Sequence, residues 1–143
     1  MRDKKFTKIM LAAVILITVV TAFIFVCSGS EPDGDSQEKI TDFLAECGYT
    51  VANPVTKEIT IPENFSEVYT SYNEIQKKQG FDLSRYKGKS ATLYTFTVIG
   101  YINEQGEPEN HIEAHVIVCG GKIVGADVSS TRLDGFMKGV RSK

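Results

Sequence analysis

The sequence contains none of the short motifs that define the commonest catalytic and cofactor sites. It has no glycine-rich phosphate loop, no HExxH metal motif, no Gly-x-Ser-x-Gly elbow and no CxxC pair. These absences exclude the phosphate-binding, zinc-hydrolase and serine-hydrolase sites that such motifs define. We therefore expect no cofactor and no enzymatic activity.

Positive charge is scarce beyond the N-terminal tip. The first 30 residues carry a net charge of +3, from Arg2, Lys4, Lys5 and Lys8 against Asp3. The rest of the chain holds 12 Lys and Arg residues against 17 Asp and Glu residues, which gives a net charge of −5. An acidic body of this kind repels phosphate groups, so we expect no nucleic-acid partner.

One uncharged apolar run follows the basic tip, from Ile9 to Val26, with the sequence IMLAAVILITVVTAFIFV. As a helix its 18 residues would span about 27 Å, close to a bilayer hydrocarbon core of roughly 30 Å. The run has no polar face of the kind that a helix packed on a soluble domain shows. Because basic residues precede the run and acidic residues follow it, we expect a single-pass signal anchor in the cell membrane. The N-terminus would then lie in the cytoplasm and the body outside.

Cys27 stands at the end of this run and admits three interpretations. The bulky Phe25 and Val26 before it disfavour lipid attachment, which normally requires small residues there. Cleavage of a leader is compatible with the small residues Ser28 and Ser30. We adopt an uncleaved anchor, and the other two interpretations stay open.

Apolar spacing predicts a first helix after the linker. Asp35 and Glu38 form a capping pair, and Gly48 supplies a left-handed stop. Between them one apolar stripe recurs at helical spacing: Ile40, Phe43, Leu44 and Cys47.

A second helix is predicted between a capping pair, Asn64 and Glu67, and a terminating Gly80. Its expected buried face is Phe65, Val68, Tyr69, Tyr72, Ile75 and Gln76.

Alternation of apolar and polar residues predicts four strands. They cover residues 55–61, 91–102, 111–118 and 123–130. The resulting order, α-β-α-β-β-β, indicates an α+β domain in which helices pack on one side of an antiparallel sheet of about four strands. The predicted organisation is a basic tip and anchor at 1–30, a linker at 31–35 and an extracytoplasmic domain at 36–143.

The turn CGGK between the last two strands is compatible with two registers. A two-residue turn pairs Cys119 with Lys122 and places Asp127 on the apolar face. A three-residue loop pairs Val118 with Lys122 and aligns the apolar residues of the two strands: Ile112, Ala114 and Val116 with Val124, Ala126 and Val128. We choose the second register, because a slip of one residue would move every side chain to the opposite face.

Several longer stretches are similar to a known family. The pieces YNEIQKKQGFDL, GADVSS and DGFM carry the likeness, which extends over about residues 40–140. The chain resembles the family known as domain of unknown function 4830, small bacterial proteins of the Clostridia type that commonly have one N-terminal hydrophobic segment. The resemblance implies an origin and domain boundaries, and it implies no site.

Polar and aromatic side chains gather near the end of the second predicted helix and in the loop after it. Tyrosines at helical spacing are typical of a core or its rim as well as of ligand contacts. If the domain binds a partner, we expect this face and the segment DVSSTRLDGFM to carry the site. The candidate residues are Tyr72, Asn73, Gln76, Gln79, Asp82, Asp127 and Asp134.

The chosen register also places His111, Glu113 and His115 on one strand face, with Asp127 on the neighbouring strand beside Glu113. Imidazole and carboxylate groups at this spacing suit a transition metal such as zinc. The same pattern is typical of the solvated side of a sheet. We predict no metal site, and these four residues are the candidates if a metal does bind.

Cys47 and Cys119 are the two cysteines of the predicted domain. Outside the membrane they have the opportunity to form a disulfide bond. Otherwise Cys47 packs in the core, and both alternatives stay open.

Taken as a whole, the sequence predicts a membrane-tethered, extracytoplasmic, non-catalytic domain. An adaptor or sensor of the cell envelope, with an envelope protein as partner, fits this description. The alternative is a small metal-binding or hydrolytic envelope enzyme that uses the His/Glu/Asp cluster.

Overall fold

The structure is a computed structural model that describes residues 34–142. The predicted signal anchor and Cys27 lie outside these residues. None of the helices formed by residues 34–142 has the length and apolar character that crossing a bilayer requires. The described elements are α2 (Gln37–Glu46), β1 (Thr50–Thr60), α3 (Glu67–Lys78), the 3-10 helix η1 (Leu83–Tyr86), β2 (Ser90–Ile99), β3 (Ile112–Cys119), β4 (Lys122–Ser130) and β5 (Met137–Gly139).

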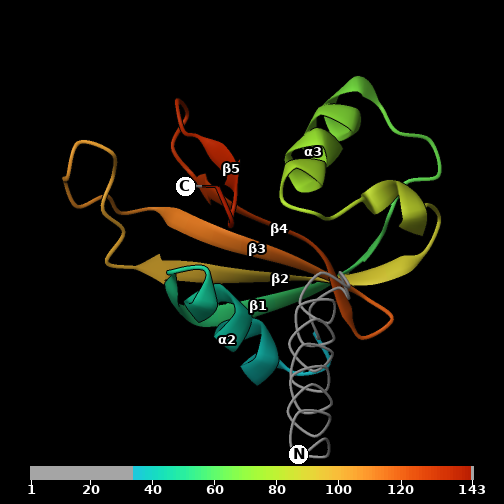
Figure 1. The fold of residues 1–143 in the computed structure, drawn as a ribbon, viewed down its shortest axis with the longest axis horizontal. Helices are drawn as coiled ribbons and strands as arrows, with labels where there is room; N and C mark the ends of the chain where they lie inside the picture. Colours follow the sequence, from blue (N-terminus) through green and yellow to red (C-terminus); the bar gives the residue numbers. More distant parts are fainter. Residues whose placement is uncertain (1–33, 143) are drawn as a thin grey trace, which may run out of the picture. The chain divides into compact units, whose positions relative to one another are not determined.

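The strands form one antiparallel sheet in the order β1-β2-β3-β4-β5, so that each strand pairs with its neighbour in the sequence (Figure 1). The predicted α+β class is confirmed, but the sheet has a fifth strand. β5 is only three residues long and pairs with Asp127, Val128 and Ser129 of β4. A strand this short shows no alternation, which is why the sequence did not indicate it.

The two helices cover opposite faces of the sheet, not one side as the sequence analysis expected (Figure 1). The buried residues of α2 pack with Phe96, Val116 and Val128. The tyrosines of α3 pack with Ile117, Leu93 and other side chains of the opposite face. The prediction failed because β4 and the second half of β3 are buried on both faces, which requires cover on each side of the sheet.

The N-cap residues of both helices lie one or two positions after the predicted ones, Asp35 and Asn64. Ser36 caps α2 by accepting a hydrogen bond from the amide of Lys39, and Ser66 caps α3 by accepting one from the amide of Tyr69. The predicted glycine stops are confirmed, since Gly48 and Gly80 both have φ of +93°.

The expected buried faces are confirmed for one helix and partly wrong for the other. In α2, Ile40, Phe43 and Leu44 are buried as predicted. In α3, Val68 is exposed, and the buried residues of the helix are the polar Asn73 and Gln76.

β1 begins at Thr50 and runs through Pro54, whereas the predicted strand began only at Val55. Its pairing with β2 shifts between Ala52 and Val55. This bulge contains the proline and Asn53, whose φ is +52°. Proline is tolerated there because it lies at a bulge on an edge strand.

The β3–β4 hairpin combines features of both registers considered for it. Its turn is the two-residue one, with Cys119 opposite Lys122, so the predicted three-residue loop is wrong. The register then shifts by one residue after Val118, and Ala126 comes to lie opposite Val116. Ala126 and Val128 share a face with Ala114 and Val116 as expected, but each pairs with a residue two positions from the predicted partner, and Val124 joins the core on the α3 side.

The two cysteines of the domain are free thiols on opposite faces of the sheet. Cys47 packs against the α2-side core, whereas Cys119 belongs to the α3-side core. Because the sheet lies between them, they do not form the disulfide bond that the sequence left open.

Candidate functional site

A cavity of about 250 Å³ opens on the α3 side of the sheet, between α3 and the strands. We call it the Asp127 pocket. All five strands and α3 contribute to its wall, which is mostly apolar. The lining residues are Ile59, Tyr69, Tyr72, Leu93, His115, Ile117, Asp127 and Met137.

Asp127 is the most buried polar group of the pocket. Its side chain is 2% exposed. The hydroxyl of Tyr72 donates a hydrogen bond of 2.7 Å to Oδ1, and Nδ1 of His115 lies 3.1 Å from Oδ2. A buried carboxylate is costly unless donors satisfy it, and here each oxygen has one.

His115 lies between two carboxylates. Its Nε2 is 3.4 Å from Oε2 of Glu113, on the side of the ring opposite to Asp127. The imidazole is 21% exposed and Glu113 is 40% exposed. The polar groups therefore form a row from the buried Tyr72 to the solvent-facing Glu113.

The environment shifts two pKa values in this row. Burial raises the pKa of Tyr72 well above its ordinary value of 10.0, and the charge of Asp127 raises it further. Burial alone would lower the pKa of His115. The hydrogen bond and charge of Asp127, followed by those of Glu113, outweigh this effect and raise it above 6.5. At neutral pH the phenol is neutral, and the imidazole is more readily protonated than a free histidine.

Three of the predicted metal candidates meet, but their register differs from the prediction. His115, not Glu113, lies opposite Asp127, because the two-residue turn and the bulge each displace the pairing by one residue from the predicted register. Glu113, His115 and Asp127 form a row and do not surround a common point. Among residues 34–142, no group of three or more His, Cys, Asp or Glu side chains is arranged to hold a metal ion.

His111 does not join this row. It has a left-handed backbone, with φ of +66°, and β3 begins only at the next residue. Its carbonyl accepts hydrogen bonds from the amide and hydroxyl of Thr131. This local geometry breaks the alternation that the sequence predicted for His111, Glu113 and His115.

Four of the predicted surface residues have structural roles. Asn73 donates to the carboxylate of Asp82 at 3.0 Å and accepts from the amide of Leu83 at 2.8 Å. Asp82 also accepts from the amide and the hydroxyl of Ser84. These bonds hold η1 against the end of α3, and those from Ser84, with that from Asn73 next, lower the pKa of Asp82 to about 2.

Gln76 and Gln79 complete the edge of β4 beyond the point where β5 ends. Oε1 of Gln76 accepts from the amide of Ala126 at 2.8 Å, and Nε2 of Gln79 donates to the carbonyl of the same residue. Two side-chain amides thus replace the backbone groups of a neighbouring strand. Asp134, the remaining candidate, is exposed in the segment between β4 and β5.

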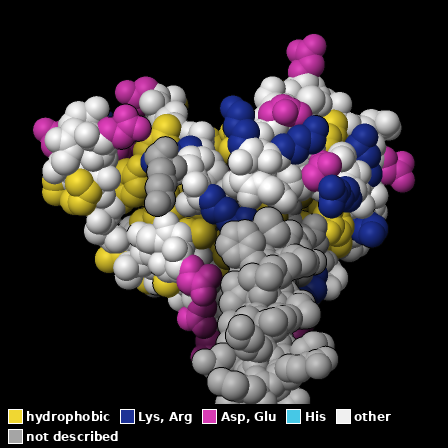
Figure 2. Space-filling model, in the orientation of Figure 1, with side chains coloured by type: hydrophobic (Ala, Val, Ile, Leu, Met, Phe, Trp, Pro, Cys, Tyr) yellow, Lys and Arg dark blue, Asp and Glu magenta, His cyan; other side chains and the backbone are white. Residues whose placement is uncertain are grey.

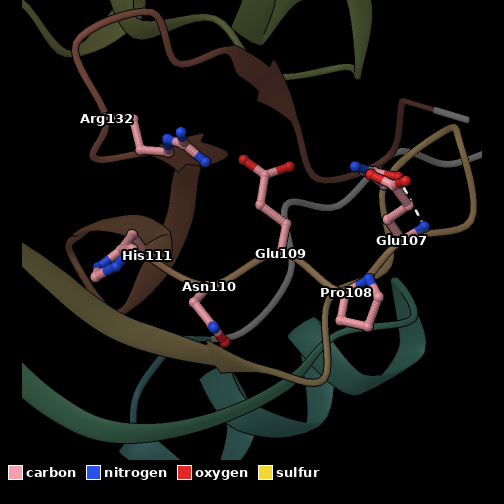
Figure 3. Close-up of a pocket in the computed structure, with 7 residues that line it drawn as sticks. Glu107, Pro108, Glu109, Asn110, His111 and Arg132 are labelled. Atoms are coloured by element: carbon pink, nitrogen blue, oxygen red, sulfur yellow. Dashed lines mark hydrogen bonds between the residues drawn. The ribbon is translucent and has the colours of Figure 1, made fainter.

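Sequence reasoning missed a second cavity, of about 390 Å³, between the β2–β3 loop and the segment after β4. Figure 3 shows Glu109 and Arg132 pointing toward each other across this cavity. His111 contributes to its lining, which is mostly polar. No local pattern relates Glu109 to Arg132, because only the fold brings their two loops together.

The apolar residues of the Asp127 pocket were also missed. Ile59, Leu93 and Ile117 were not among the candidate residues, and Met137 was included only as the last residue of the segment DVSSTRLDGFM. The sequence analysis nevertheless placed Tyr72 and Asp127 in one candidate site, and both line the pocket.

Comparison with known proteins gives one match. The family described as Domain of unknown function (DUF4830) matches residues 43–128, a span that includes every lining residue of the Asp127 pocket except Met137. No curated protein and no solved structure matches the chain significantly.

Proposed function

This chain belongs to the DUF4830 family, a family of unknown function, and on that premise we propose that it is a non-catalytic binding domain whose ligand occupies the Asp127 pocket. The domain acts as an adaptor or sensor in the cell envelope. The run from Ile9 to Val26 tethers it to the membrane and places its body on the outer side. Hydropathy and the change of charge across the run support this location.

The observation that carries the proposal is a buried carboxylate at an apolar cavity. A fold that needs only stability has little reason to keep Asp127 in its interior, because a well-packed apolar residue does at least as well. An apolar cavity with a few convergent polar groups and perturbed pKa values is the usual form of a binding site. The Asp127 pocket has each of these features.

The same geometry suits the binding of a charged group. Nδ1 of His115 faces Asp127 and Nε2 faces Glu113, so both ring nitrogens have a partner. The contacts of the row therefore keep the side chains of Asp127, His115 and Glu113 in fixed positions.

A photocrosslinking experiment tests whether the pocket is occupied in the cell. Met137 is half exposed at the pocket, and Leu133 is fully exposed in the segment just before β5. A photoreactive amino acid at position 137 of the full chain, in the membranes of its own host cell, should give adducts. The same residue at position 133 should give few.

The control for specificity is Asp127→Asn, which keeps the size of the side chain and removes its charge. Adducts at position 137 should be lost in this variant, provided that its thermal melting still shows a folded domain. Tyr72→Phe is a second variant that removes one hydrogen bond from the same carboxylate. Equal adducts at positions 137 and 133, or adducts that persist in both variants, would contradict the proposal.

A further inference from the structure

We infer that the ligand of the Asp127 pocket is an organic cation, an aliphatic ammonium whose alkyl part packs on the apolar wall while its charge lies at the end of the cavity formed by His115 and Asp127. The inference rests on the function proposed above and adds the chemical class of the ligand. Four properties of the pocket lead to it.

The first property is the apolar wall. Leu93 from β2, Ile117 from β3 and Met137 from β5 line the same cavity. Met137 is half exposed, so part of this wall is open to solvent. An alkyl chain placed here would remove apolar surface from water on both sides of the contact. The ligand therefore has an aliphatic part.

The second property is the aromatic side of the cavity. Tyr69 and Tyr72 come from one face of α3, with ring centroids 5.8 Å apart and planes at 67°. The faces of aromatic rings attract cations, and alkylammonium groups are typical occupants of sites with several such rings. Two tyrosine rings beside a carboxylate favour a cation over an anion or a neutral group.

The third property is the charge of the polar row. With a neutral His115, Asp127 and Glu113 place two negative charges within hydrogen-bonding or ion-pair distance of the same ring. A proton on His115 neutralises one of them. An ammonium ion in the pocket supplies the same positive charge, so it takes the place of that proton.

The fourth property is the small number of other charged groups that face His115. α3 contributes only the phenols of Tyr69 and Tyr72, and burial raises the pKa of each. β4 contributes Asp127, and β2 contributes Thr95, which lies opposite His115.

The remaining strands add one cation. β5 contributes the uncharged Met137. β1 places Lys57 on this face, two strands from His115, because Lys57 pairs with Leu93. Among the described residues around His115, the carboxylates of Asp127, which lines the pocket, and of Glu113, on the other side of the ring, therefore dominate the charge.

The exchange of a proton for an ammonium ion makes the affinity depend on pH. Protonated His115 opposes the ligand, so affinity rises as His115 loses its proton. One proton is exchanged, so the affinity increases by at most about tenfold per pH unit. Because the pKa of His115 is raised above 6.5, the increase continues above pH 6.5 and ends once His115 is neutral.

The test is an NMR titration of the full chain in detergent micelles. The chain has two histidines, and His111 lies outside the pocket, so its ring is an internal reference. Butylammonium, butyrate and butanol have alkyl parts of similar size and differ in charge. We expect butylammonium to shift the ring signals of His115 and to leave those of His111 unchanged. It should bind at least tenfold more tightly than butyrate or butanol.

Three results would contradict the inference. Equal affinity for butanol would mean that the pocket is merely apolar, and tighter binding of butyrate would mean that it selects anions. An affinity that does not rise between pH 6 and pH 8 would exclude the proton exchange.

Glu113→Gln is the sharpest variant, because Glu113 is partly exposed and its replacement should leave the fold intact. We expect butylammonium to bind several-fold more weakly and butanol to bind as before. Glu109→Gln, at the second cavity, is the matched control and should change neither affinity.

Two further arms identify the source of the ammonium group. A short peptide with one lysine is compared with the same peptide carrying norleucine. Tighter binding of the lysine peptide than of butylammonium indicates the side chain of a partner protein, and the reverse order indicates a free amine. Equal binding of the norleucine peptide would overturn the inference.

The outcome also separates this inference from the proposed function. If butylammonium leaves His115 unchanged while adducts at Met137 still require Asp127, the pocket binds a ligand of another class and only the inference fails. If both experiments fail, neither the inference nor the proposed function stands.

Discussion

Two aspartates of this domain show how strongly the surroundings of a single residue decide its role. Asp127 is buried at a cavity with one donor on each oxygen. Asp82 lies at the surface-facing start of η1, where its Oδ1 alone accepts from Asn73 and from both donors of Ser84. The sequence analysis put both in one candidate surface. The structure assigns the first to the pocket and the second to the end of a helix.

The pH dependence of stability should reveal the role of Asp82. Its pKa is lowered from 3.8 to about 2, so its carboxylate stabilises the folded state above about pH 4. This contribution is lost as the pH falls toward 2. We expect Asp82→Asn to reduce the urea midpoint at pH 7 and to flatten its decline between pH 4 and pH 2.

Asp134→Asn is the control, because Asp134 is exposed between β4 and β5. It should leave the decline unchanged. An Asp82→Asn variant that loses stability with acid as steeply as the unmodified chain would refute this assignment.

At the scale of elements, the edge of β4 depends on a helix. β5 pairs with only three residues of β4, and the backbone of Ala126 lies beyond them. Gln76 and Gln79 of the α3 end occupy this position, and Nε2 of Gln79 also donates to Oε1 of Gln76 at 3.0 Å. Unpaired strand edges are prone to pairing with other chains, so the two glutamines also protect this edge.

Replacing either glutamine should expose the importance of these contacts. Gln79→Met leaves the buried carbonyl of Ala126 without its donor, and Gln76→Met leaves the amide without its acceptor. An unsatisfied buried polar group costs about 1–3 kcal/mol, and we expect each variant to lose this much stability in urea. In Gln76→Met the amide of Ala126 should also exchange with solvent faster.

Lys78→Met serves as the control on the same helix, because Lys78 is exposed. It should change stability by less than about 0.5 kcal/mol. If Gln76→Met and Gln79→Met are equally harmless, the glutamines do not support the β4 edge.

At the scale of the whole molecule, the described domain is a sheet between two helices with its charges unevenly distributed. Figure 2 shows acidic side chains over the β2–β3 loop, and lysine and arginine side chains gathered mainly over α3 and η1. Residues 34–142 contain two clusters of buried apolar side chains, one on each face of the sheet. The domain therefore contains its own core.

The start of the domain can be located closely. The amide of Gly34 donates to the carbonyl of Gly121, and a side chain at Gly34 would come within about 3 Å of Val118 and Ile123. Ser36 then caps α2. Residues 34–36 thus belong to the fold and not to a linker.

Two truncations test this boundary together with the membrane tether. A chain that starts at Glu31 should melt cooperatively and stay in the supernatant after centrifugation, whereas the full chain should sediment with membranes. A chain that starts at Gln37 loses the Ser36 cap and should be less stable by about 1 kcal/mol or more.

The comparison of full and shortened chains also has a clear negative outcome. A full chain that stays in the supernatant would refute the proposed tether. Equal stability of the two shortened chains would show that residues 34–36 contribute nothing to the fold.

The sequence by itself determined the local elements of this protein. Periodicity and glycine placement located α2, α3, β2, β3 and β4, because these signals act within a few residues and need no tertiary partner. The same local reasoning identified Tyr72, His115 and Asp127 as residues worth attention.

Only the tertiary structure decided how these pieces meet. The register shift between Ile117 and Val118 placed His115 beside Asp127, the burial of β4 on both faces required a helix on each side of the sheet, and a three-residue strand added Met137 to the pocket. Each of these depends on contacts between residues far apart in the chain. The energy of such contacts comes from packing and from satisfying buried polar groups, and no local pattern records it.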